Sequence, residues 1–300
     1  MTGKARTLYS TSMVTTRHGV DLLLHRWQPA RDGETQAVLA RVALVHGLGE
    51  HAGRYDALAL ALNAAAIELI AVDLRGHGKS SGPRVQVRVF NDYLRDTDVL
   101  LEACAATPPA ATPLFLMGHS MGGTIAALYA IERAPQRKLA GLILSSPALK
   151  PGPGTPRWKL ALSRLAGLIA PRMAAFSIDP ALLSRASGVV SAYQRDPLVH
   201  HGPVPARTAA QILAGMERVA AQRATLELPL RIFHGTADAI CDPAGSREFE
   251  AHVGSTDSTL AMVQDGAHET LNDLDRDRVI RELIDWILVR AEHARTHASG

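Results

Sequence analysis

The chain has 300 residues, of which 47% are apolar and 20% are charged. This composition suffices for one large core with an inserted lobe and excludes a disordered chain. Lysine and arginine outnumber aspartate and glutamate by only 32 to 29, so we expect no nucleic-acid partner.

The cysteine content and the N-terminus bear on the cellular compartment. Cys104 and Cys241 are too few for a disulfide scaffold and fit a reducing environment. The N-terminus has no continuous apolar segment followed by a cleavage site, and no run reaches the ~18 apolar residues of a membrane-spanning helix. The sequence therefore predicts a soluble, cytoplasmic protein that would tolerate an anionic lipid surface. It does not indicate an oligomeric state.

The predicted elements begin with a β-hairpin, in which residues 13–17 and 20–26 flank His18-Gly19. Short apolar runs then alternate with helical patterns. Runs without polar alternation indicate strands buried on both faces, hence a mostly parallel sheet with helices as right-handed crossovers. The runs lie at 42–45, 67–72, 114–117, 139–144, 230–233 and 259–263, and the helical patterns at 54–65, 89–106, 122–132, 244–253 and 275–294.

One region interrupts this alternation. Between residues 147 and 227 no apolar run predicts a buried strand, and the region opens with Pro147 and the sequence PGPG at 151–154. Such a segment is too long for a loop in a compact domain. We therefore expect a mainly helical cap at 147–227, inserted between two parts of an α/β core at 1–146 and 228–300.

The first helix expected in this cap covers residues 158–170. It places Trp158, Leu162, Leu165 and Ile169 on one face. Such a face either packs on the core or touches lipid, and the pattern alone leaves both interpretations open.

The segment GHSMG at 118–122 matches the G-x-S-x-G motif. A buried strand enters it and a helix of small residues leaves it, which is the context that the motif requires. The serine of such a turn has a strained backbone, and large side chains two residues away would collide with the strand or the helix. The sequence therefore predicts Ser120 as a nucleophile exposed at the N-terminus of a helix.

An acyl-transfer site also needs two backbone N–H donors for the oxyanion. One is expected from Met121, which follows the nucleophile. The second is expected from Leu48, because the glycine-containing segment HGLGEH at 46–51 follows the first buried parallel strand. His46 and His51 would also suit a metal, but no carboxylate or cysteine with ligand spacing joins them. We therefore expect no metal and no cofactor.

The general base and its orienting acid are expected in the order serine, acid, histidine. Asp238 follows the run at 230–233, and His268 follows the run at 259–263, so both should lie at the strand edge that carries Ser120. In this scheme His268 accepts the proton of Ser120, Asp238 orients the histidine, and an acyl-enzyme forms and is hydrolysed. The weaker candidates are Asp242 and Asp265 for the acid, and His77, His119, His200 and His201 for the base.

At this point the motifs resemble those of monoacylglycerol lipases. The similar segments are HGLGEHAGRY at 46–55, DLRGHGKS at 73–80, GHSMGG at 118–123, and the cap segments 178–185 and 193–198. The resemblance implies an α/β-hydrolase fold, cleavage of one fatty acid from a monoacylglycerol, and a cap with an acyl tunnel and a lipid-facing surface. It extends to bacterial lysophospholipases and broad-range esterases, which leaves the substrate open.

The resemblance further implies Glu50, Arg54 and Tyr193 as polar contacts to the glycerol head group. For Glu50 and Arg54, an ion pair that holds the loop is the alternative. The mammalian relatives carry a second histidine three residues after the catalytic one, where this chain has Leu271. One head-group contact of those relatives is therefore missing here.

The sequence thus favours a lipid ester hydrolase that contacts membranes transiently through its cap. Two other classes of protein are alternative interpretations. A peptidase of the proline-iminopeptidase type would need an acidic anchor for a free amine. A non-catalytic receptor on a hydrolase scaffold would need neither an intact triad nor an oxyanion loop. The carboxylates that the cap offers are few: Asp179, Asp196, Glu217 and Glu227.

Overall fold

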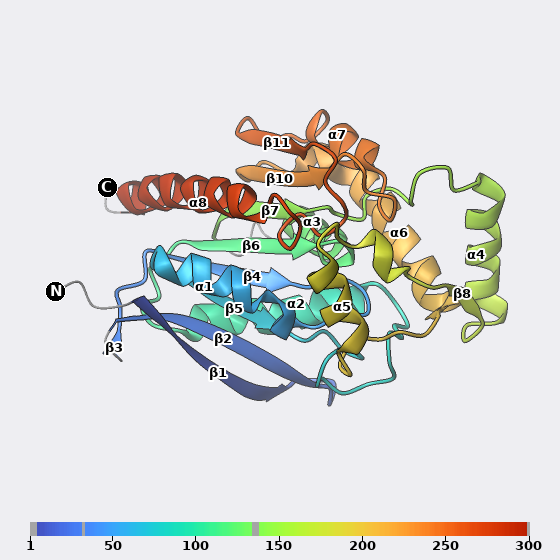
Figure 1. The fold of residues 1–300 in the computed structure, drawn as a ribbon, viewed down its shortest axis with the longest axis horizontal. Helices are drawn as coiled ribbons and strands as arrows, with labels where there is room; N and C mark the ends of the chain where they lie inside the picture. Colours follow the sequence, from blue (N-terminus) through green and yellow to red (C-terminus); the bar gives the residue numbers. More distant parts are fainter. Residues whose placement is uncertain (1–4, 32–33, 134–137, 299–300) are drawn as a thin grey trace.

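The computed structural model of the protein describes residues 5–31, 34–133 and 138–298. Residues 1–4, part of the N-terminus in which no leader is expected, lie outside this range. The centre is a sheet with the strand order β1-β2-β5-β4-β6-β7-β10-β11, and β3 pairs with β2 (Figure 1). The strands are β1 (Ala5–Thr15), β2 (Asp21–Arg31), β3 (Glu34–Thr35), β4 (Ala40–Val45), β5 (Ile67–Val72), β6 (Leu114–His119), β7 (Leu139–Ser145), β10 (Leu230–Gly235) and β11 (Ser258–Val263).

The strand directions confirm a mostly parallel sheet. All pairings from β5 through β4, β6, β7 and β10 to β11 are parallel, whereas β2 pairs antiparallel with both β1 and β5. The expected N-terminal hairpin is present, although each of its strands is longer than the pattern indicated. It turns between Thr15 and Asp21, where Gly19 has a φ of 71° that other residues rarely adopt.

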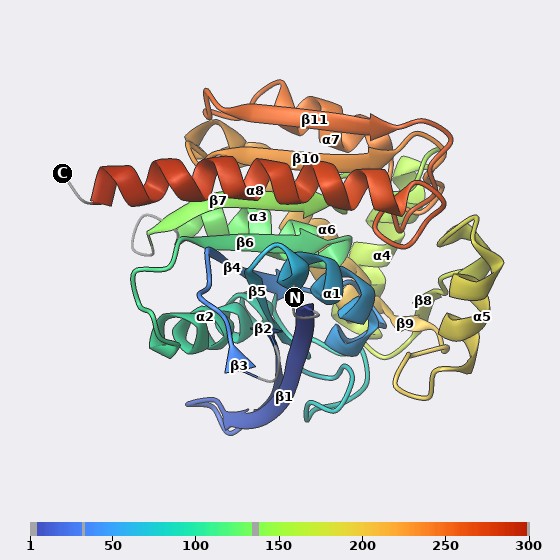
Figure 2. The same cartoon turned by 60° about the vertical axis from the view of Figure 1, so that its left-hand side comes forward.

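Helices cover both faces of the sheet (Figure 2). The elements α1 (Asp56–Ala64), which follows the 3-10 turn η1 (Ala52–Tyr55), and α8 (Arg276–Ala298) cover one face. The other face carries α2 (Asn91–Ala106) and α3 (Met121–Glu132), and α7 (Pro243–Glu250) lies beside β10 and β11. The six predicted strands and five predicted helices are therefore confirmed, with ends that differ by a few residues.

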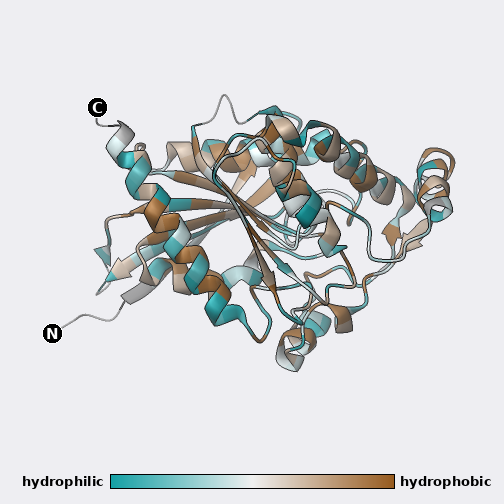
Figure 3. Ribbon diagram, turned by 90° about the horizontal axis from the view of Figure 1, so that it is seen from above, coloured by the Kyte–Doolittle hydropathy of each residue, from teal (hydrophilic) through white to brown (hydrophobic). Residues whose placement is uncertain are grey.

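Alternate side chains of the central strands enter two separate clusters of buried residues. In β4, Val42 and Leu44 pack towards α1 and α8, whereas Ala43 and Val45 pack towards α2 and α3. Figure 3 shows these strands as mainly hydrophobic in the middle of the molecule. Burial on both faces explains why the sequence shows continuous apolar runs instead of alternation.

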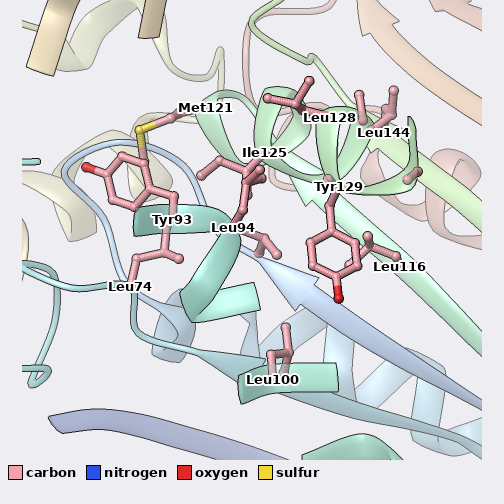
Figure 4. Close-up of a cluster of buried hydrophobic side chains, with 14 of the residues drawn as sticks. Leu74, Tyr93, Leu94, Leu100, Leu116, Met121, Ile125, Leu128, Tyr129 and Leu144 are labelled. Carbon is pink, nitrogen blue, oxygen red and sulfur yellow. The ribbon is translucent and has the colours of Figure 1, made fainter. Parts of the chain in front are cut away.

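The cluster on the α2 and α3 face carries the turn that holds Ser120. Figure 4 shows Tyr93 and Leu94 of α2 beside Met121 and Ile125 of α3. All of these side chains are buried. The first turn of α3 is therefore fixed by close packing on α2 and on the sheet.

The chain between β7 and β10 forms the region expected to be the cap, beyond the carboxyl ends of the parallel strands (Figure 1). Its elements are α4 (Arg157–Ile169), β8 (Ala174–Phe176), η3 (Pro180–Leu182), α5 (Ser187–Arg195), β9 (Val204–Pro205), α6 (Ala206–Gln222) and η4 (Arg223–Thr225). Thr208 of α6 donates to the Val85 carbonyl oxygen at 2.8 Å, so α6 is also tied to the core. The boundaries at 147 and 227 stay a prediction.

Helix α4 does not pack its apolar face on the core. Gly167 lies so close to α6 that a Cβ there would come within 2.7 Å of the Ala210 Cβ. The expected face points elsewhere: Trp158, Leu162 and Ile169 are 63%, 53% and 75% exposed. Of the two interpretations of this face, packing on the core is therefore wrong. No helix in the described part of the chain is long and apolar enough to cross a membrane.

Candidate active site

Ser120 lies in the turn between β6 and α3, with a φ of 54° that is uncommon for a non-glycine residue. A Cβ on Gly118 would come within 2.2 Å of the Gly122 carbonyl oxygen, and a Cβ on Gly122 within 2.1 Å of the Val45 carbonyl oxygen. The Ser120 carbonyl oxygen accepts from the Ala148 N–H at 2.9 Å, which holds the turn. These contacts explain the glycines at both ends of the motif.

His268 and Asp238 are joined at the same edge of the sheet. His268 Nδ1 lies 2.7 Å from Asp238 Oδ2, and both side chains are buried. Because an ionised carboxylate only accepts, Nδ1 donates, which leaves Nε2 of the neutral ring as an acceptor. Ser120 and His268 line the same small cavity of about 20 Å³. The structure thus joins His268 to Asp238 and places Ser120 and His268 on the wall of the same cavity, from the ends of β6, β10 and β11.

The carboxylate sets the pKa of the histidine. Burial by itself would lower the pKa of His268, but the Asp238 charge outweighs it and holds that pKa above the ordinary value of 6.5. Burial by itself would likewise raise the pKa of Asp238, whereas His268 and His234 hold it well below 3.8. The pair therefore consists of an ionised acid and a strengthened base.

Asp238 has further partners that the sequence patterns did not indicate. Its Oδ2 accepts from His234 Nε2 at 3.1 Å, and its Oδ1 accepts from the N–H groups of Ile240 and Cys241 at 2.8 and 3.0 Å. His234 in turn accepts from Ser246 Oγ at 2.7 Å. The position of His234 at the end of β10, four residues before the acid, was the available signal.

The alternative acids occupy other roles. The Asp242 side chain accepts from the Ala244 N–H and caps α7, with Pro243 in its first turn. Asp265 is exposed in a turn, where it accepts from Gln264 and has a φ of 53°. Neither side chain hydrogen-bonds His268, which favours Asp238 as the orienting acid.

One of the two expected oxyanion donors lines the Ser120 cavity, and the other directly follows Ser120 in the chain. Leu48 lines the cavity beside Ser120, and its N–H donates to no acceptor within the described part of the chain. Met121 is the first residue of α3, where N–H groups lack intrahelical acceptors. Gly47 is confined, since a Cβ there would lie 3.3 Å from the Ser120 Cβ.

Glu50 and Arg54 belong to a buried ionic cluster that holds this loop. Glu50 accepts from the Gly47 N–H at 2.6 Å and from Arg54 at 2.6 Å. Arg54 also forms a two-pronged ion pair with Glu269, the residue after His268, at 2.8 and 2.9 Å. Although burial opposes ionisation of Glu50, the Arg54 charge keeps its pKa at about 2. Glu269 was not expected from the sequence, because 215 positions separate it from Arg54.

Tyr193 lies over this cluster. The Arg54 guanidinium carbon is 4.8 Å from the centre of its ring. Burial raises the pKa of the Tyr193 hydroxyl to about 12, so it stays protonated. Within the described residues the hydroxyl has no hydrogen-bond partner, and the side chain lines both the Ser120 cavity and an adjoining cavity of about 70 Å³.

The other histidines near the site have structural contacts. His46 donates from Nδ1 to the Gly47 carbonyl oxygen at 2.7 Å, and its Nε2 accepts from the Leu74 N–H at 2.9 Å. His51 pairs with Asp196 of the cap at 2.8 Å. Burial and the nearby His268 lower the pKa of His119 to about 4. No metal-binding group of three or more ligands occurs among the described residues.

A much larger apolar cavity adjoins the Ser120 cavity. It measures about 710 Å³ and lies between α4, β8 and α6. We call it the acyl chamber, and its lining includes Trp158, Leu162, Ala166, Met173, Phe176 and Met216. Ser177 and Ala239 line the chamber, whereas the next residues, Ile178 and Ile240, line the Ser120 cavity. The two cavities are therefore neighbours.

Known proteins are similar to this chain in sequence and in fold. A family model described as serine aminopeptidase, S33, matches residues 36–275. The chain is 34% identical to the monoacylglycerol lipase of Mycolicibacterium smegmatis, over 90% of this chain and 94% of that protein. It is 33% identical to the monoglyceride lipase of Rattus norvegicus, over 90% and 87%.

Solved structures agree with these relatives. The crystal structure of Paleococcus ferrophilus monoacylglycerol lipase has a TM-score of 0.75 and 30% identity, over 95% of this chain and 99% of that one. The fold and the site define the class as α/β hydrolase. Within that class the chain belongs to the serine aminopeptidase S33 family and, inside it, to the monoacylglycerol lipases. The resemblance inferred from the motifs is therefore confirmed.

Proposed function

We propose that the protein hydrolyses monoacylglycerols to a fatty acid and glycerol through an acyl-enzyme on Ser120. His268 Nε2 takes the Ser120 proton as Oγ attacks the ester carbonyl, and the N–H groups of Leu48 and Met121 stabilise the oxyanion. The carbon–oxygen bond to glycerol then breaks, and His268 returns the proton to the leaving alcohol. Water attacks the acyl-enzyme by the same route and releases the acid, with no cofactor.

The acyl chamber is the observation that carries this substrate. Its lining is predominantly apolar, it neighbours the cavity that Ser120 lines, and its volume lies in the range of small-molecule sites. An acyl chain buried there gains free energy with each methylene group. One chamber for one acyl chain suits a monoacylglycerol, the substrate class of the similar lipases from Mycolicibacterium smegmatis and Rattus norvegicus.

The glycerol side lies at Tyr193. Its hydroxyl has no partner among the described residues, and its side chain lines both the Ser120 cavity and the adjoining cavity, which His200 and His201 also line. Glu50 is already bonded to Arg54 and to the Gly47 N–H, and Arg54 is also bonded to Glu269. We therefore assign Glu50 and Arg54 to holding the oxyanion loop. Tyr193 is thus the head-group contact that we retain from the three expected.

The competing substrates lack the partners that they need. Neither an amine nor a phosphate finds a free counter-charge at Ser120, because Glu50 and Glu269 are both paired with Arg54. The cap carboxylates do not line the Ser120 cavity. An uncharged glycerol head group therefore suits the site better than an aminopeptidase or lysophospholipase substrate.

Contact with a lipid surface is part of this proposal. The exposed face of α4 includes Leu165, Leu168 and Ile169, and its neighbours Trp158 and Leu162 also line the acyl chamber. An amphipathic helix of this kind inserts its apolar face at a membrane interface. A substrate would then pass from the lipid into the chamber. The cytoplasmic location expected from the sequence stays a prediction.

A substrate panel tests the function. Wild type should release fatty acid from monoacylglycerols faster than from triacylglycerols, lysophospholipids or aminoacyl anilides. Ser120→Ala should lower kcat about ten-thousandfold or more while the protein stays folded. A Ser120→Ala protein that keeps most of its turnover would show that the nucleophile is elsewhere, and a preference for anilides would show that the substrate class is wrong.

A further inference from the structure

A second apolar pocket lies directly behind the acyl chamber. It measures about 170 Å³ and is bounded by α4, α6, α7 and the segment 149–151. We call it the outer pocket. Its apolar lining includes Leu149, Leu160, Leu213, Met216, Val219 and Phe249.

The two cavities share one wall. Pro151, Leu160, Leu213 and Met216 line both the outer pocket and the acyl chamber. Three of these side chains come from α4 and α6 and are only partly buried. Methionine is unbranched and adapts its shape to its neighbours, so Met216 is the part of the wall that can yield to a ligand.

Four of the five charged side chains that line the outer pocket form ion pairs with each other. Lys150 pairs with Glu248, and Arg164 pairs with Glu217, whereas Arg223 donates to the Ala220 carbonyl oxygen at 3.0 Å. An apolar chain end that enters the pocket exchanges water for aliphatic side chains without separating either ion pair.

We propose that the outer pocket receives the methyl end of acyl chains that are too long for the acyl chamber, and that the wall of Leu160, Leu213 and Met216 sets the chain-length preference. This rests on the proposed function, since the chain must start at Ser120. The order of sites along a long substrate is then glycerol at Tyr193, ester at Ser120, chain in the chamber and methyl end in the outer pocket.

Ala220→Trp tests this assignment. Ala220 is exposed on α6 and lines the outer pocket but not the chamber, so a large side chain there fills the pocket with little risk to the fold. Ala221 is its exposed neighbour, lines neither cavity, and gives the matched control Ala221→Trp. The measurement is kcat/KM for monooctanoyl-, monolauroyl-, monopalmitoyl- and monoarachidoylglycerol, with thermal unfolding as the check on folding.

The expected result is a changed ratio between long and short chains. Each methylene group excluded from an apolar site lowers kcat/KM about fourfold. Exclusion of several methylene groups in Ala220→Trp should therefore lower the ratio of kcat/KM for monopalmitoylglycerol to that for monooctanoylglycerol about tenfold or more. Ala221→Trp should keep the wild-type ratio. Met216→Phe, which thickens the wall from within, should lower the ratio as well.

Two outcomes overturn the inference, and they are distinguishable. Equal ratios in wild type, Ala220→Trp and Met216→Phe show that chains end within the chamber, although the proposed function stands. A wild type that cleaves none of the monoacylglycerols removes the proposed function and this inference with it.

Discussion

At the scale of single residues, the site depends on Asp238 more than its place in a loop suggested. The carboxylate joins His268 and His234 through one oxygen and two backbone N–H groups through the other. Both carboxylate oxygens accept hydrogen bonds that fix the orientation of the group, so the orientation of His268 is determined before substrate binds. The strained Ser120 and the confined Gly47 show the same preorganisation on the nucleophile side.

In the proposed mechanism Asp238 controls the pH profile. Only neutral His268 would act as the base, so kcat/KM should rise with pH through the pKa of His268, which Asp238 holds above 6.5. Asp238→Asn removes the charge that raises this pKa. We expect the acid limb of the profile to move to lower pH and kcat to fall about 10⁴-fold.

The measurement is kcat/KM against pH on a water-soluble ester. Asp265→Asn is the matched control, because Asp265 is an exposed aspartate close in sequence to His268 that makes no contact with it. It should leave the profile unchanged. An Asp238→Asn variant with the wild-type midpoint would contradict the assignment of the acid.

At the scale of elements, α4 is the part whose role its own pattern could not decide. The helix contacts α6 through a glycine–alanine crossing and leaves a row of large apolar side chains exposed. Contiguous exposed apolar surface on a soluble domain marks an interaction site. Its continuity with the lining of the acyl chamber favours a lipid surface as the partner.

Replacing Leu168 and Ile169 together by glutamate should weaken binding to lipid vesicles about tenfold or more, since two large side chains lose their apolar environment. Neither residue lines the chamber. Hydrolysis of emulsified monoacylglycerol should fall with binding, and hydrolysis of a soluble short-chain ester should not. Vesicle sedimentation measures the first effect.

The double variant Leu60→Glu, Val289→Glu is the control for this prediction, because it adds the same two charges at side chains that are 56% and 50% exposed on α1 and α8, away from α4. It should bind vesicles as wild type does. If this control and the α4 variant lose binding equally, the loss reflects net charge and not a specific face.

At the scale of the whole molecule, one acidic side chain couples the cap to the loop of His268. Asp273 accepts from the Arg185 N–H and guanidinium, both at 2.8 Å, and from the Ala267 N–H at 2.9 Å. The Glu269 N–H donates to the Leu183 carbonyl oxygen at 2.7 Å. The segment 183–185 thus holds the loop after β11 that carries His268.

Arg185→Ala removes the ion pairs of Arg185 with both Asp273 and Asp275 and should destabilise the protein by about 1 kcal/mol, since Arg185 is partly exposed in both pairs. The effect should depend on pH. Burial would raise the pKa of Asp273, but the Ala267 N–H and Arg185 hold it below 3.8. The stabilisation is therefore complete above pH 3.8 and lost as the pH falls through the lower pKa of the folded protein.

Thermal unfolding of wild type and Arg185→Ala as a function of pH measures this coupling. We expect the two melting temperatures to differ at neutral pH and to converge in acid. Arg276→Ala, an exposed arginine of α8, is the control and should match wild type throughout. A difference that persists unchanged in acid would mean that Arg185 acts without Asp273.

Much of this molecule follows from local sequence. The continuous apolar runs predicted the central strands, because strands covered on both faces need apolar side chains at every position. The strand-turn-helix around Ser120 predicted the nucleophile, because only small residues fit where strand and helix approach so closely. The rule that parallel strands present their carboxyl ends at one edge predicted that Asp238 and His268 lie near Ser120, where the structure has them.

The tertiary structure alone decided the rest. Several features depend on side chains that the fold brings together from different elements. They are the ion pair of Arg54 with Glu269, the hydrogen bond of His234 to Asp238, and the wall between the acyl chamber and the outer pocket. The environment of α4 was also decided by the tertiary structure. The sequence pattern of its apolar face fits a buried helix and an exposed one equally, and only its packing on α6 shows which it is. A pattern records the environment of each residue along one element, whereas partners and cavities arise only where elements meet.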